Sequence, residues 1–132
     1  MRHGAVIGNP VVHVELIGPD PDALRRFYRE LFGWDAPPDA PVAPRISSPE
    51  AYSFIEPAEQ AAAVPGGIGG GAGFEAHALF SVGVADVGAA LQQVERLDGT
   101  VVLPPQRNDA GGVVVGRFRD PAGNLVGLAA PA

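Results

Sequence analysis

The segment that decides the fold is residues 11–34, VVHVELIGPDPDALRRFYRELFGW, which predicts a strand followed directly by a helix. Alternate side chains of a strand lie on opposite faces. The valines at even positions and Leu16 therefore share one face, while His13 and Glu15 share the other. This pattern leaves two interpretations open. Either the imidazole and the carboxylate line a ligand cavity, or they face water.

The helix in this segment has clear end signals. The carboxylate of Asp20 can cap its first turn, and Pro21 suits the first helical position. Gly33 is expected to end the helix in the left-handed conformation. An apolar stripe follows helical spacing, at Leu24, Phe27, Tyr28 and Leu31. The arginines, Arg25 among them, are expected to face solvent.

The same order of elements recurs in the second half of the chain. A strand is predicted over 77–84, and a helix follows it with Asp86 as cap and Gly99 as end. A displacement of 66 residues, half the chain length, places Gly33 on Gly99, which indicates an internal repeat. Further strands are predicted at 51–57, near Gly66–Gly70, and at 100–105, 111–118 and 124–130. The proline-rich stretch 36–50 is expected to hold at most a short edge strand.

Composition narrows the class of protein. The chain has 132 residues, which suits one domain, and its net charge is −6 without a basic cluster. Nucleic acid and anionic membrane surfaces are therefore not expected as partners. There is no cysteine, which excludes disulfides and thiolate chemistry. Neither a signal peptide nor an apolar run of about 20 residues is apparent, so a cytoplasmic location is expected.

Two longer stretches carry a family likeness. HVELIGPDPDALRRFYRELFGW resembles the first module of the vicinal oxygen chelate superfamily, which includes glyoxalase I, extradiol dioxygenases and bleomycin resistance proteins. VADVGAALQQVERLDGTVVLPP, followed by GRFRDPAGNLVGL, resembles its second module. The resemblance implies an α+β fold of two βαβββ modules, about 10–73 and 74–132, whose curved half-barrel sheets surround a cavity. It also implies a homodimer, with modules paired within or across chains.

The resemblance also places the metal ligands of the family, in the first and last strand of each module. These positions fall on His13, Leu79, Gly127 and one residue among Gly67, Ile68 and Gly69. Leucine and glycine side chains cannot bind a metal, and a stable iron or zinc site needs at least three protein ligands. No metal cofactor is therefore expected. The alternative is a relocated divalent metal site built from His13, Glu15 and His77.

Three functions from different classes follow from these residues. The first is metal-independent binding of a small molecule in the cavity, for example to sequester a toxic compound. The second is a glyoxalase- or dioxygenase-type metalloenzyme with a relocated site that uses His13. The third is a vestigial cavity in a protein-interaction module. No catalytic residue is assigned, and the segments 36–50 and 57–75 are expected to shape the cavity mouth. The residues predicted to bind the ligand are His13, Glu15, Tyr52, Phe54, His77 and Leu79.

Overall fold

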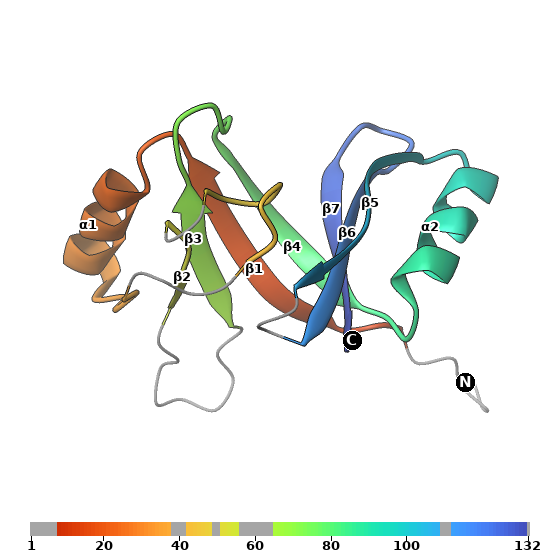
Figure 1. Ribbon diagram of the computed structural model, residues 1–132, viewed down its shortest axis with the longest axis horizontal. Helices are drawn as coiled ribbons and strands as arrows, with labels where there is room; N and C mark the ends of the chain where they lie inside the picture. Colours follow the sequence, from red (N-terminus) through yellow and green to blue (C-terminus); the bar gives the residue numbers. More distant parts are fainter. Residues whose placement is uncertain (1–7, 38–41, 49–50, 56–64, 109–111, 132) are drawn as a thin grey trace.

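Two helices lie at opposite ends of one continuous, open sheet in the computed structural model (Figure 1). The structure describes residues 8–37, 42–48, 51–55, 65–108 and 112–131. These residues form β1 (Val11–Gly18), α1 (Pro21–Phe32), β2 (Ser53–Ile55), β3 (Gly66–Gly70), β4 (His77–Gly83), α2 (Val87–Arg96), β5 (Thr100–Asn108), β6 (Val113–Arg119) and β7 (Leu125–Pro131). Within this described part, neither helix has the length and apolar character needed to span a bilayer.

The strand order, β2-β3-β1-β4-β7-β6-β5, joins the two halves of the chain edge to edge. In each half the first strand pairs in parallel with the last, as β1 with β3 and β4 with β7. The halves meet through the antiparallel pair of β1 and β4, so the modules pair within this chain. The predicted α+β fold is therefore confirmed. In the described part of 36–50, residues 44–46 form a turn in place of an edge strand.

The predicted helix caps are confirmed at the start of both helices. The Asp20 and Asp86 carboxylates accept hydrogen bonds from the third residue after each cap, at 3.2 and 3.0 Å. The two caps are 86 − 20 = 66 residues apart, the spacing of the internal repeat. Gly33 is left-handed as expected, with φ at 72°. The prediction for Gly99 is wrong, because Asp98 takes the left-handed conformation there, with φ at 69°.

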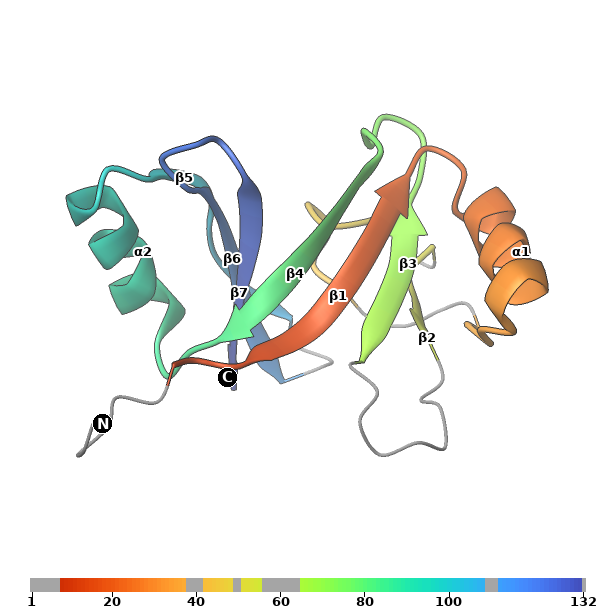
Figure 2. The same cartoon turned by 180° about the vertical axis from the view of Figure 1, so that it is seen from behind.

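The central strand β1 has its polar face inside the molecule and its apolar face outside. Glu15 and Ile17 are buried, and His13 is half-buried beside them. Val12 and Val14, on the opposite face, are exposed. Figure 2 shows why, since β1 and β4 cross the back of the molecule with no helix lying over them. The curved sheet turns its polar side toward the enclosed space.

The apolar stripe of α1 is likewise exposed within a single chain. Phe27 and Leu31 are more than half exposed, because α1 lies against β3, whose glycines offer almost no side chains for packing. Arg25, expected to face solvent, instead has a side chain only 15% exposed. Its guanidinium donates hydrogen bonds to the Ala51 carbonyl at 2.9 Å and to the Ser53 hydroxyl at 3.1 Å. The solvent-facing prediction for Arg25 is therefore wrong, and its side chain ties α1 to the start of β2.

Candidate ligand-binding site

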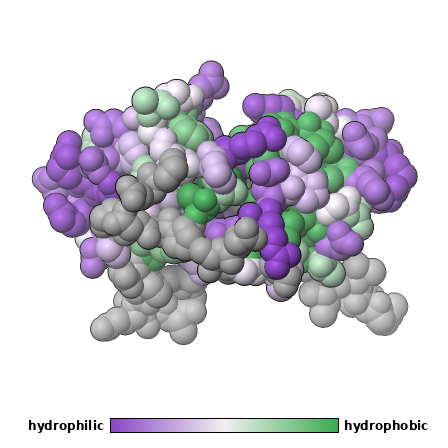
Figure 3. Space-filling model, in the orientation of Figure 1, coloured by the Kyte–Doolittle hydropathy of each residue, from purple (hydrophilic) through white to green (hydrophobic). Residues whose placement is uncertain are grey.

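A cavity of about 230 Å³ lies between the two halves of the sheet. One side of its wall comes from β1, β2 and the turn at 44–46, and the other from β4, β6, β7 and the last residue of β5, Asn108. In the space-filling view, hydrophobic residues lie around the centre of this face, between hydrophilic helices at the two ends (Figure 3). Val42 and Ile46 belong to the lining, so the described part of 36–50 contributes to the cavity as predicted. The described lining is mostly apolar, with a small group of polar side chains on β1, β4, β5 and β6 and at Tyr52, just before β2.

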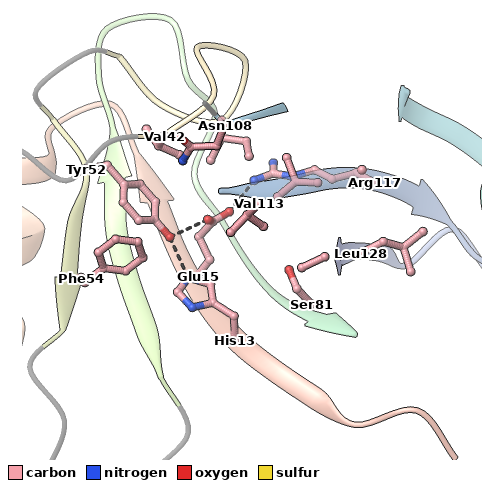
Figure 4. A pocket seen from close by; sticks show the side chains of 14 residues that line it. His13, Glu15, Val42, Tyr52, Phe54, Ser81, Asn108, Val113, Arg117 and Leu128 are labelled. Carbon is pink, nitrogen blue, oxygen red and sulfur yellow. Dashed lines mark hydrogen bonds and ion pairs between the residues drawn. The ribbon is translucent and has the colours of Figure 1, made fainter. Parts of the chain in front are cut away.

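A buried ion pair crosses the cavity wall. The Arg117 guanidinium, on β6, donates to the Glu15 carboxylate, on β1 (Figure 4). Both residues are buried. A buried charge is costly unless it is paired and hydrogen-bonded. Each of these two groups therefore depends on the other, and together they add no net charge to the cavity.

The Tyr52 hydroxyl connects His13 to Glu15. It donates to Glu15 Oε1 at 2.7 Å, and His13 Nε2 lies 2.8 Å from the same hydroxyl. Because the phenolic proton is directed to Glu15, Nε2 of His13 carries a proton and donates to the Tyr52 oxygen. Nδ1 of His13 is then the unprotonated nitrogen. His13 and Glu15, which share one face of β1, are therefore linked through Tyr52.

The protonation of this group is controlled by burial. Burial lowers the pKa of His13 below its usual 6.5, against the opposing effect of the nearby Glu15 carboxylate. The imidazole is therefore neutral at pH 7. Burial raises the pKa of Tyr52 far above its usual value, and the charge and hydrogen bond of Glu15 raise it further. The phenol therefore stays protonated and remains a donor.

The glycines of β3 create the space that Tyr52 occupies. A Cβ atom at Gly67 would lie 2.0 Å from the Tyr52 hydroxyl, and one at Gly69 would lie 2.5 Å from the ring. Only a strand without side chains at these positions allows the ring to lie against its backbone. The position of the Tyr52 ring therefore requires the glycine-rich sequence of β3.

Four of the six predicted ligand-binding residues line the cavity: His13, Glu15, Tyr52 and Phe54. His77 contacts the ion pair through Arg117 instead: its Nε2 is 3.3 Å from the Arg117 guanidinium, and its Nδ1 is 3.0 Å from the Glu75 carbonyl. Leu79 is buried opposite Glu15 in the β1–β4 pair. Among the described lining residues, neither His77 nor Leu79 is present.

Arg117 and Ser81 are cavity residues that the sequence analysis missed. Arg117 follows Val113 and Val115 on one face of β6, and an arginine on an otherwise apolar strand face is a sign of a buried carboxylate nearby. Ser81 lies directly opposite His13 in the β1–β4 pair. The 66-residue repeat could have identified Ser81, because it aligns Ser81 with Glu15. Ser81 is therefore expected on the cavity face of its strand.

The donor set does not fit the metal site that the resemblance implies. In the first half Glu15 pairs with Gly67, and in the second half Ser81, 66 residues after Glu15, pairs with Gly127. Gly67 therefore corresponds to Gly127, and it is the fourth ligand position. Only His13 among the four positions carries a ligating side chain. The alternative set of His13, Glu15 and His77 is not brought together either, because Tyr52 and Arg117 lie between its members. Within the described ranges, no three His, Cys, Asp or Glu side chains are grouped to hold a metal ion.

Comparison with known proteins gives one family and one fold. The family model described as Glyoxalase/Bleomycin resistance protein/Dioxygenase superfamily matches residues 11–128. No curated protein sequence matches. Methylmalonyl-CoA epimerase from Mycobacterium tuberculosis is a similar solved structure, with a TM-score of 0.66 and 15% identity over 100% of this chain and 93% of that chain.

Two further solved structures show the same fold. A variant of Streptomyces coelicolor methylmalonyl-CoA epimerase, in complex with 2-nitronate-propionyl-CoA, has a TM-score of 0.65 and 16% identity over 94% of this chain and 98% of that chain. A structure described as NAD-dependent benzaldehyde dehydrogenase from Legionella pneumophila has a TM-score of 0.58 and 14% identity, over 91% and 98%. At these identities the likeness concerns the fold alone, and one fold hosts many activities.

Proposed function

Because this chain belongs to the Glyoxalase/Bleomycin resistance protein/Dioxygenase superfamily, we propose that it binds a small organic molecule in its cavity without a metal ion. The observation that carries the proposal is the Tyr52 hydroxyl, which is hydrogen-bonded to both His13 and Glu15. The two side chains best suited to ligate a metal are thus engaged with a phenol. Sequestration of a toxic compound is one form that such binding takes.

The two other function classes have less support. A relocated metal site would have to form beside the Arg117 guanidinium, whose positive charge opposes a second cation. A protein-interaction module with a vestigial cavity would be expected to have a packed interior. The cavity of about 230 Å³, with polar groups in its wall, favours ligand binding instead.

Metal content and ligand binding test this proposal together. We expect protein expressed with iron, zinc, nickel and manganese, then dialysed briefly without chelator, to hold far less than one metal ion per chain. The same protein with EDTA should gain thermal stability from at least one compound of a small-molecule panel, because a ligand that binds only the folded state raises its Tm. Elemental analysis and differential scanning fluorimetry give the two readouts.

Three variants make the result specific. His13→Ala should leave the metal content unchanged, and near-stoichiometric metal that disappears in His13→Ala would contradict the proposal. Val113→Phe, in the cavity wall, should abolish the Tm gain by filling the space. Val102→Phe, on exposed β5 surface, is the matched control and should keep the gain.

We also propose that a second copy of the chain covers the outer face of β1 and β4. Val14 and Phe80 lie opposite each other there and are 39% and 43% exposed. Exposed apolar patches of this kind are typical of protein interfaces. In a two-fold dimer the same patch of both copies meets, so Val14 and Phe80 of each chain would be covered by the same strands of the other.

Charge on this face is expected to separate the dimer. In light scattering coupled to size-exclusion chromatography, the wild type should elute with the mass of two chains. Val14→Lys combined with Phe80→Lys should give the mass of one chain, since dimerisation would then bury unpaired ammonium groups. Val102→Lys, on the exposed face of edge strand β5, should remain dimeric. A wild type of single-chain mass throughout the accessible concentration range would rule the dimer out.

A further inference from the structure

Two polar groups in the cavity wall retain unused hydrogen-bonding capacity. Nδ1 of His13 is an acceptor, since Nε2 donates to Tyr52, and it has no hydrogen-bond partner among the residues that the structure describes. The Ser81 hydroxyl also has none within the described residues. The two residues are directly opposite in the β1–β4 pair, where Cβ atoms are about 4.5–5.5 Å apart. One ligand group can therefore reach both.

The other polar groups of the wall already have partners. Glu15 accepts from both Tyr52 and Arg117, and the two charges neutralise each other. Arg117 is the only cation among the described lining residues. A charged ligand would lose its hydration without meeting a free countercharge, which is unfavourable. The cavity therefore favours an uncharged ligand.

The remaining wall is shaped for a flat apolar ring. Phe54 stands edge-on to both His13 and Tyr52, with ring centroids 5.9 and 5.5 Å away, and its ring is half exposed. Val113 and Leu128 line the opposite side (Figure 4). Aromatic rings prefer such edge-to-face and offset neighbours. The volume of about 230 Å³ is below the usual 300–1,000 Å³ for drug-sized ligands, so it suits a single ring with small substituents.

We propose that the ligand is an uncharged, single-ring aromatic molecule bearing a hydroxyl group. Its ring lies between Phe54 and the apolar wall of β6 and β7. Its hydroxyl donates to Nδ1 of His13 and accepts from the hydroxyl of Ser81. This assignment rests on the proposed function, because it specifies the ligand class for the same cavity.

Three probes of similar size distinguish the contributions of the ring, the hydroxyl group and a negative charge: phenol, toluene and benzoate. Affinities are measured by following backbone amide shifts in NMR titrations at pH 7.5. Phenol should bind about tenfold more tightly than toluene, because two hydrogen bonds add to the same ring contact. Benzoate should bind more weakly than phenol. Equal affinity for phenol and toluene, or preference for benzoate, would overturn the ligand class.

Variants identify the two hydrogen-bonding groups. Ser81→Ala should weaken phenol about three- to tenfold while leaving toluene unchanged, since one net hydrogen bond is lost. Ser48→Ala, outside the cavity lining, is the matched control. Phenol affinity should also fall as the pH drops below 6.5, because protonated His13 has no acceptor nitrogen. A Ser81→Ala effect shared equally by both probes would indicate a structural role and contradict the assignment.

The ligand class and the proposed function fail in different ways. Binding of other compounds from the panel, but not of phenol, would overturn the ligand class and leave the proposed function intact. Binding of no compound by metal-free protein would overturn both. Phenol binding that survives in Val113→Phe would place the site outside the cavity and would also overturn the assignment.

Discussion

Replacing Arg117 by methionine is expected to lower the free energy of unfolding by about 3–5 kcal/mol. The substitution keeps an unbranched apolar stem but removes the cation that Glu15 requires, and it leaves a carboxylate buried at 6% exposure without a countercharge. The loss is a large fraction of the 5–15 kcal/mol that stabilises a typical domain. Urea denaturation at pH 7, followed by circular dichroism, measures it.

Two further variants separate the ion pair from the general loss of an arginine. Arg119→Met is the matched control on the same strand, because among the described residues Arg119 donates only to the Gly123 carbonyl at the surface. It should change stability by less than about 1 kcal/mol. Glu15→Gln combined with Arg117→Met should recover most of the lost stability, since glutamine carries no charge and still accepts from Tyr52. A loss in Arg119→Met as large as in Arg117→Met would refute this account.

The second large effect is expected for Gly67→Ala. The added methyl group would lie 2.0 Å from the Tyr52 hydroxyl and 2.4 Å from its Cζ atom. Because the obstacle is a buried ring, either the ring or β3 must move, at a cost of about 1–3 kcal/mol or more. Loss of the bridge between His13 and Glu15 should accompany the shift. Chemical denaturation measures the stability, and the phenol titration measures the site.

A double-mutant cycle assigns this effect to Tyr52. In a Tyr52→Leu background, where the ring is absent, Gly67→Ala should cost much less than in the wild type. Gly8→Ala is the matched control, because a Cβ atom at Gly8 would meet no atom of the described residues within 4 Å. Equal costs of Gly67→Ala in both backgrounds would locate the strain in the β3 backbone rather than at the ring.

The features of the fold that could be predicted from sequence depend on local chemistry. The carboxylate of Asp20 and Pro21 mark the start of α1 and Gly33 marks its end, and the 66-residue repeat transfers the same order of elements to the second half. The ends of elements are predicted less well where tertiary contacts decide them: the predicted strand 51–57 begins only at Ser53, and its residues 56–57 lie outside the described residues. At the end of α2, the close approach of Gly99 to Val94 determines the geometry, because a Cβ there would lie 2.6 Å from Val94 Cγ1.

The site was less predictable because it is assembled across the chain. Alternation along β1 identified the shared face of His13 and Glu15, and that face does line the cavity. The apolar face of β6 marks Arg117 among the nine arginines as a buried residue, but no local signal identifies Glu15 as its partner. The apolar stripe of α1 did not predict the inward position of Arg25, which donates to the Ala51 carbonyl. An apolar stripe normally packs on side chains of the neighbouring strand, and the glycines of β3 do not provide them.

The distance along the chain between Glu15 and Arg117, 102 residues, also has a consequence for biosynthesis. A ribosome adds about 5–20 residues per second, so the guanidinium is synthesised roughly 5–20 s after the carboxylate that needs it. During that interval the nascent first half has no Arg117 with which to bury Glu15, and β1 lacks its neighbour β4 for most of it. The first half is therefore expected to complete its folding only after β4 and β6 have been synthesised. Until then its valine-rich strand stays accessible to chaperones.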